Sequence, residues 1–132
     1  METLRARART RSLGELFWDW GIPTAASVAQ LADLDLDIIA TGGVRHGLDI
    51  ARALALGATA GGMARPFLMA WNETGRAGAS AAAAQVAMEV RIGLLLAGAA
   101  SAADLQTKPL MVHDTLGRWV PADTALRNRM LG

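Results

Sequence analysis

The stretch that decides the fold is DIIATGGVRHGLDIARALALGATAGGMARP, residues 37–66. Its apolar run at 37–40 ends in glycines, which is typical of a buried parallel strand that turns sharply at its carboxyl end. From Gly47 apolar residues recur at helical spacing as far as Gly57, where a left-handed residue is expected to end the helix. Residues 58–64 form a second expected strand. Strand, helix and strand in this order predict one right-handed parallel unit.

Glycine-containing turns follow both expected strands, Thr41-Gly42-Gly43-Val44-Arg45 and Gly61-Gly62-Met63-Ala64-Arg65-Pro66. Residues without a Cβ allow consecutive backbone N–H groups to approach a phosphate closely. The second turn leads into a helix expected to begin at Pro66, whose amino terminus would add free N–H groups and a positive dipole end. In (β/α)8 barrels a phosphate commonly lies between two such loops and a short extra helix. The turns therefore predict a phosphate site, with two tight turns and no ligand as the alternative.

The flanking sequence predicts further helices on both sides of this unit. They are expected at Thr24–Leu34, at 66–71, at Ser80–Ala97 after a polar loop at 72–78, and after Ser101, which forms a capping box with Asp104. Residues 1–12 are a basic lead-in, and residues 111–132 are a tail of mixed composition.

Composition excludes several classes of protein. A chain of 132 residues bounds a single core, and 52% hydrophobic against 19% charged residues argue against disorder. The formal charge of +1 gives no overall attraction to nucleic acid or to an anionic membrane. The absence of cysteine excludes disulfides, thiolate metal sites and cysteine nucleophiles, and fits a reducing cytoplasm. No uncharged stretch approaches the roughly 20 residues of a membrane span, so a soluble protein is expected.

Other polar and aromatic residues are expected to have ordinary structural roles. The two histidines, His46 and His113, lack the spacing of a metal site, so no metal ligands are predicted. Asp33, Asp35 and Asp37 are interpreted as a solvated turn, because they lack the glycine and glutamate of a calcium loop. Packing roles are expected for the large apolar residues Trp18, Trp20, Trp71, Trp119, Met63, Met69 and Met88.

Longer strings carry a resemblance to a known family. They are FWDWGIPT (17–24), ATGGVR (40–45), LALGA (54–58), GMARPFL (62–68) and ADLQTKPL (103–110). In this order they resemble type 2 isopentenyl-diphosphate isomerase, over roughly Leu13 to Leu110. The middle strings are shared with other FMN or nucleotide-phosphate barrels, such as 2-hydroxy-acid oxidases and inosine-monophosphate dehydrogenase. The first and last strings favour the isomerase.

The resemblance implies a flavoenzyme that interconverts isopentenyl and dimethylallyl diphosphate with reduced FMN, with Mg2+ on the diphosphate, and with NADPH. It implies a cytoplasmic protein that acts on a small diphosphate substrate and forms a homo-oligomer when full length. By matching positions, Gly42, Gly43 and Val44 would hold the FMN phosphate from one loop together with Arg45. Ala64 and Arg65 would hold it from the next loop. The family's catalytic, substrate-binding and metal-binding residues have no identified counterpart in this chain.

The expected fold class is α/β, a partial TIM (β/α)8 barrel. Residues 1–132 would be the carboxyl-terminal portion of one FMN-binding domain: the last two βα units, a short phosphate-binding helix and carboxyl-terminal helices. A whole barrel typically needs about 250 residues, and two strands alone leave open edges. Two other functions stay open. One is an FMN barrel oxidoreductase of the 2-hydroxy-acid oxidase type, and the other is a non-catalytic truncated remnant.

Overall fold

The centre of the molecule is a strand, helix, strand unit. The computed structural model describes residues 12–131, so most of the basic lead-in lies outside it. Strand β1 (Ile39–Ala40) pairs in parallel with β2 (Ala60–Gly61), and helix α3 (Gly47–Leu56) connects them. Gly57 ends α3 in the left-handed region at φ +115°. The predicted parallel unit and its connecting helix are confirmed.

The two strands are shorter than the apolar runs that predicted them. At their amino ends the Ile38 N–H donates to the Thr59 hydroxyl rather than to a backbone carbonyl. At the carboxyl end of β1, Gly42 and Gly43 adopt positive φ angles and turn the chain away. The backbone ladder is therefore confined to two residues in each strand.

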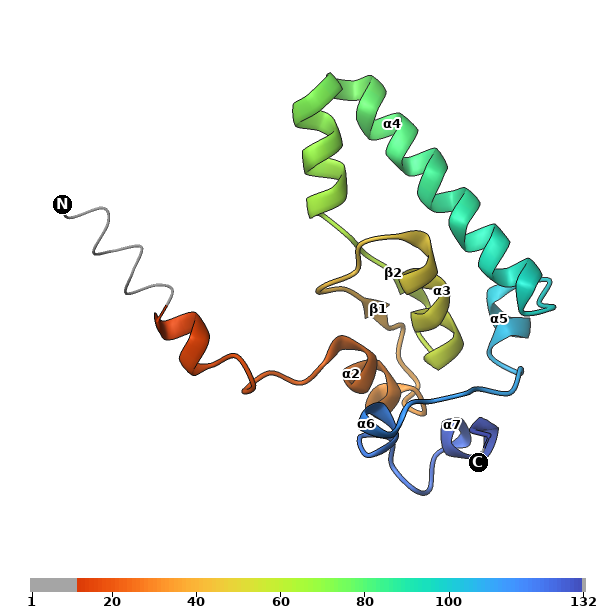
Figure 1. The fold of residues 1–132 in the computed structure, drawn as a ribbon. Coiled ribbons are helices and arrows are strands. Elements are labelled where there is room, and N and C mark those ends of the chain that lie inside the picture. The colour runs from red at the N-terminus through yellow and green to blue at the C-terminus, as the bar shows by residue number, and fades with distance from the viewer. Residues whose placement is uncertain (1–11, 132) are drawn as a thin grey trace.

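Helices and the tail pack around part of this unit (Figure 1), while Ile39 of β1 stays exposed. Helix α3 packs against the long helix α4 and against α5, while α2 packs on the other side of α3 and on β1. In Figure 1 α6 lies beside α2, and residues 12–22 extend away from the body. The remaining helices are α2 (Thr24–Leu31), α4 (Arg65–Leu96), α5 (Ala102–Leu105), α6 (Asp114–Gly117) and α7 (Ala125–Arg129).

Two helix predictions need correction. Helix α2 ends at Leu31, short of the expected Leu34. The break expected at 72–78 is present but shorter, because α4 consists of two helical segments separated only at Thr74 and Gly75, where φ of the glycine is +62°. Polar residues on an exposed helix face look like a loop in sequence, since both are solvated. The glycine alone supplies the backbone angle that breaks the helix.

The core is small and includes residues of the tail, where no apolar periodicity is visible in the sequence. Val120 and Leu126 are buried together with Val28, Ala29, Ala40, Ala53, Leu56 and Ala58. A second cluster joins α3 to α5 through Leu54, Ala55, Ala99 and Leu105. The tail is also anchored by the Asp33 carboxylate, which accepts the Ala125 N–H at 3.0 Å. Asp33 thus lies in an exposed turn, as predicted, and in addition anchors the tail.

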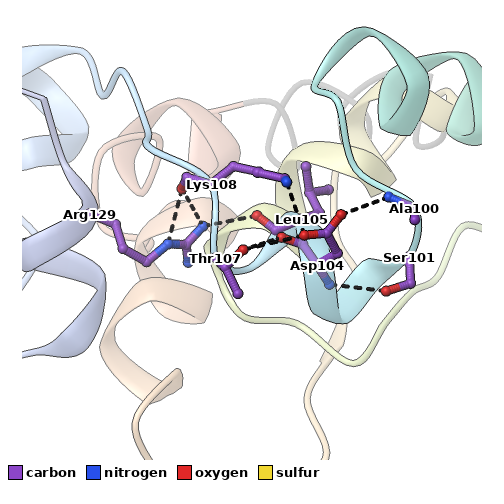
Figure 2. A network of polar contacts seen from close by, with 7 residues as sticks. All are labelled: Ala100, Ser101, Asp104, Leu105, Thr107, Lys108 and Arg129. Carbon is purple, nitrogen blue, oxygen red and sulfur yellow. Dashed lines mark hydrogen bonds and ion pairs between the residues drawn. The ribbon is translucent and has the colours of Figure 1, made fainter.

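A polar network ties the tail to the segment after α5 (Figure 2). The Arg129 guanidinium donates to the carbonyls of Lys108 at 3.0 Å and Leu105 at 3.2 Å. Lys108 forms an ion pair of 2.9 Å with Asp104. The Asp104 N–H donates to the Ser101 hydroxyl, as the capping box predicts, but its carboxylate accepts the N–H of Ala100 rather than that of Ser101. The hydrogen bond from Ala100, followed by that from Lys108, lowers the pKa of Asp104.

Much of the apolar surface is exposed, which corrects the packing roles expected for the aromatic and methionine residues. Trp18 and Trp20 are each 83% exposed. Exposed side chains also include Trp71, Met69, Met88 and the β1 residue Ile39. These residues have no packing partner within residues 12–131 sufficient to bury them.

Helix α4 is, among the described residues, the one helix long and apolar enough to cross a membrane by length and composition. No membrane span is expected here from the sequence, because charged and polar residues interrupt the apolar sequence of this helix. In this structure, α4 packs against α3 as the outer helix of the pair. A Cβ added to Gly47 would lie 2.5 Å from the Glu89 Cβ, and one added to Gly93 would lie 3.0 Å from the Ala51 Cβ. The two helices therefore approach each other closely through glycines on both.

Candidate phosphate-binding site

A cavity of about 690 Å³ lies between the two glycine turns. All six residues predicted for the phosphate site line it, together with Thr41, Gly62, Met63, Pro66 and Met69. The six are Gly42, Gly43, Val44 and Arg45 from the turn after β1, and Ala64 and Arg65 from the turn after β2. Because β1 and β2 are parallel neighbours, the turns at their carboxyl ends meet at one edge of the sheet.

The first turn presents backbone donors. Gly42 and Gly43 have φ angles of +94° and +73°, which residues with a Cβ rarely adopt. Among the described residues, no acceptor pairs with the N–H groups of Gly42, Gly43 or Val44, whereas the N–H of Arg45 donates to Asp49 Oδ2 at 3.1 Å. A Cβ on Gly43 would enter open space. This glycine is therefore required by the backbone conformation and leaves room in front of it.

The second turn presents its free donors at the two predicted residues, Ala64 and Arg65, and not at its glycines. The Gly62 N–H donates to the Ala40 carbonyl at 2.8 Å and is not available to a ligand. Gly61 makes room for α3, because a Cβ there would lie 2.6 Å from Ile50 Cγ1. Ala64 caps α4 without a side-chain hydrogen bond. The N–H groups of Ala64 and Arg65 have no acceptor in the described part of the chain.

Two guanidinium groups accompany these donors. Arg45 and Arg65 are exposed, line the cavity and form no ion pair within residues 12–131. Arg52, by contrast, lies 3.6 Å from the Asp49 carboxylate. A phosphate group has only acceptor oxygens and a negative charge, so unpaired N–H groups and unpaired cations around one space are the chemistry that binds it. The residues present therefore fit the phosphate of a nucleotide cofactor.

The amino end of α3, which also faces this edge, is already capped. Glu89 on α4 accepts the Gly47 N–H at 2.6 Å and the side-chain amide of Gln85 at 2.8 Å. These hydrogen bonds, the one from Gln85 being the stronger influence, lower the pKa of Glu89, and nearby His46 lowers it further. A carboxylate held at this helix end leaves the anion site to the two turns.

The histidines lie outside the cavity lining. His46 is half exposed, with its Nδ1 3.4 Å from Asp49 Oδ2. The His113 Nδ1 accepts the N–H of Thr115 at the start of α6. Within the described residues, no three histidine, aspartate or glutamate side chains come together as metal ligands.

Residues missed by the sequence analysis surround the site. The Thr24 hydroxyl donates to the Gly42 carbonyl at 2.7 Å, and Asp49 holds the other end of the same turn. The sequence places Thr24 at the start of a helix and at the end of the string FWDWGIPT, and indicates no contact with the turn. Its proximity to the turn depends on how α2 packs against β1, which local sequence does not encode. Met63 is expected in the core because its side chain is apolar, but it lines the cavity. Its position in the second turn, directly before Ala64 and Arg65, was the signal that could have shown this.

Residues 21–112 match the sequence model of the FMN-dependent dehydrogenase family. The chain belongs to this family. The family implies a TIM-barrel-like α/β fold, with which the two-stranded parallel sheet and its connecting helix are consistent. A cavity whose lining fits a phosphate group suits a member of an FMN-dependent family, because FMN carries a terminal phosphate.

Curated relatives of this chain are named isopentenyl-diphosphate delta-isomerase, and the first two described here match most of its length. One from Methanopyrus kandleri is 40% identical over 124 residues, 91% of this chain and 34% of the relative. Another, from Symbiobacterium thermophilum, is 44% identical over 104 residues, 76% of this chain and 29% of the relative. The one from Synechococcus is 53% identical over 66 residues, 48% of this chain and 19% of the relative. The chain thus spans about a third of the first two.

Proposed function

We propose that this chain supplies the FMN-phosphate site of an enzyme that interconverts isopentenyl and dimethylallyl diphosphate. The relatives named isopentenyl-diphosphate delta-isomerase support this substrate, because three of them match 76% to 95% of this chain at 37% identity or more. The family match supports FMN as the cofactor. The product would serve isoprenoid biosynthesis.

The cavity between the two glycine turns is the observation that carries the proposal. The N–H groups of Gly43 and Val44 would bind phosphate oxygens from one turn, and those of Ala64 and Arg65 from the other. The guanidinium groups of Arg45 and Arg65 would neutralise the phosphate charge. Reduced FMN, when bound, supplies the proton transfer at the allylic carbons of the substrate. The part of the chain described here would therefore bind and orient the cofactor.

Further properties belong to the same proposal. The chain would form the last two βα units of one barrel, as the carboxyl-terminal portion of an FMN-binding domain over residues 1–132. Mg2+ on the substrate diphosphate and NADPH as reductant would bind residues other than those of this cavity. The protein would be cytoplasmic and homo-oligomeric. It would have no nucleic-acid or membrane partner. The net charge of +1 and the packing of α4 on α3 support this last expectation.

A second candidate is an FMN oxidoreductase of the 2-hydroxy-acid oxidase type, which the dehydrogenase name of the family favours. Such an enzyme needs a histidine and an arginine near the flavin. Residues 1–40 contain no histidine, and this counts against an oxidoreductase of this type. The third possibility is a truncated remnant that keeps the phosphate site and has lost catalysis.

Titration of the purified chain with FMN tests the proposal, with flavin absorbance and the thermal midpoint as readouts. A ligand that binds only the native state raises its stability in proportion to the logarithm of ligand concentration. We expect stoichiometric binding and a rise in the midpoint. Binding accompanied by 2-hydroxy-acid oxidation, and not by isomerisation, in the protein that carries all eight βα units would favour the second candidate. Absence of FMN binding would contradict the assignment of the cavity.

A further inference from the structure

The turn after β1 is held from behind by a hydroxyl group. Thr24 Oγ1 lies 2.7 Å from the Gly42 carbonyl oxygen and 3.2 Å from that of Thr41. Thr24 lines a second cavity of about 180 Å³, and the turn residues Gly42, Gly43 and Val44 line both this cavity and the larger one. The turn is therefore a wall between the two, with Thr24 on the side away from the phosphate site.

This contact sets the direction of a phosphate donor. In a trans peptide the C=O of one residue and the N–H of the next point in opposite directions, and the described residues contain no cis peptide. Because Thr24 draws the Gly42 carbonyl toward α2, the Gly43 N–H is directed to the opposite side of the turn. That side is the larger cavity.

Asp49 fixes the other end of the turn. Its Oδ2 accepts the Arg45 N–H at 3.1 Å, which removes this amide from the set of phosphate donors. A carboxylate this close to an anion site would repel the ligand if it were unbalanced. His46 at 3.4 Å and Arg52 at 3.6 Å supply positive or polar partners to it. The Asp49 side chain is 27% exposed, so solvent also screens its charge.

We propose that Thr24 and Asp49 are positioning residues that hold the 41–45 turn in its phosphate-binding conformation. They hold it before the ligand arrives and touch neither phosphate nor flavin. The inference deepens the proposed function and rests on the cavity binding the FMN phosphate. It predicts that losing either contact weakens recognition of the phosphate group while the remainder of the flavin binds as before.

The test compares FMN with riboflavin, which lacks the phosphate, in the purified chain and its Thr24→Val, Thr24→Ser and Asp49→Ala variants. Valine keeps the size of the side chain and removes the hydroxyl, and serine restores it. Thr59→Val is the matched control, because its hydroxyl serves the opposite end of β1 through Ile38 and Asp37. We expect Thr24→Val and Asp49→Ala to lose about tenfold of the preference for FMN over riboflavin. Thr24→Ser and Thr59→Val should keep it.

Amide hydrogen exchange separates this inference from the proposed function, because it needs no ligand. The Arg45 amide, which is hydrogen-bonded to Asp49 within the same turn, should exchange faster in Thr24→Val than in the unaltered chain, and the Thr59→Val control should leave it unchanged. An unaltered preference for FMN and unaltered exchange in Thr24→Val would overturn the positioning role. If the unaltered chain binds FMN no better than riboflavin, the phosphate assignment fails, and exchange alone then decides whether Thr24 orders the turn.

Discussion

The tail and the phosphate turns treat backbone polar groups in opposite ways. In the tail, the carbonyls of Leu105 and Lys108 are satisfied by one guanidinium group, that of Arg129 (Figure 2). In the turns, the N–H groups of Gly43 and Val44 find no acceptor in the described part of the chain, and the nearby guanidinium of Arg65 finds no carboxylate. Both regions contain arginine, but only in the tail does an arginine side chain pair with acceptors of the described chain.

This difference separates structure from binding. A folded chain normally pairs its polar groups, so a set of donors left unpaired and facing one space needs a partner from outside. Water can satisfy such donors singly. Several N–H donors and two positively charged side chains around one cavity instead favour an anion. The arginines of this chain are therefore distinguished by the presence or absence of an internal acceptor rather than by their exposure.

The largest effect on stability is expected from Arg129→Met. The substitution removes three hydrogen bonds and leaves the Lys108 carbonyl without a partner in the described chain, whereas the Leu105 carbonyl keeps the N–H of Lys108. Hydrogen bonds that involve a charged group are each worth about 2 kcal/mol, so we expect a loss of about that size in the free energy of unfolding, measured with urea. Arg127→Met is the control, because Arg127 donates one bond, to Gly117, from an exposed position. Equal losses in both variants would contradict the structural role of the network.

The largest effect on binding is expected from Gly43→Val. A β-branched residue rarely adopts the φ of +73° found here, and its side chain would occupy the space in front of the turn. We expect FMN affinity to fall by more than about tenfold, measured by flavin fluorescence. Gly98→Val is the control, because Gly98 has φ +64° and open space around it but lies at the far end of α4. Similar FMN affinity in both variants would remove Gly43 from the site.

A smaller effect is expected from Arg65→Gln. Loss of one unpaired guanidinium should weaken FMN binding several-fold at low salt and reduce the dependence of the affinity on salt concentration. Riboflavin binding should not change. Arg91→Gln makes the same charge change on the same helix away from the cavity. An identical salt dependence in the two variants would show that Arg65 is only a solvated residue.

The smallest effect concerns pH. The pKa of Glu89 is lowered in the folded chain, so its stabilising contribution is present above the ordinary glutamate pKa of about 4.3 and is lost as pH falls below it. Glu89→Gln should therefore flatten the fall in thermal midpoint below about pH 4. Asp35→Asn is a control at a carboxylate without a hydrogen bond to a described residue. A midpoint that falls with equal slope in both variants would contradict the cap on α3.

Local sequence predicted the centre of the molecule and the residues of the cavity well. Glycines at 42, 43 and 57 carry their own backbone requirement, so both the turn and the end of α3 could be predicted from residue type. The apolar spacing of α3 predicted the burial of Ala51, Leu54 and Ala55, whereas Leu48 at its first turn is exposed. All six predicted site residues line one cavity, because parallel neighbouring strands bring their carboxyl ends together.

Features that depend on distant contacts could not be predicted. The burial of Val120 and Leu126 arises from packing on α2 and α3, and no periodicity marks it. Gly62 has the residue type of a phosphate donor, but its N–H pairs with Ala40 once the sheet forms. Thr24 lies seventeen residues before the carbonyl it binds at Thr41, and only the packing of α2 brings them together.

The central claim is that the turns after β1 and β2 bind the phosphate of FMN together. Amide chemical shifts followed by NMR during titration with FMN, and then with inorganic phosphate, test it most directly. We expect both ligands to move the amide signals of Gly42, Gly43, Val44, Ala64 and Arg65, with the Gly62 signal moving less because its N–H is already bonded to Ala40. FMN binding that leaves the signals of both turns unmoved would contradict the account.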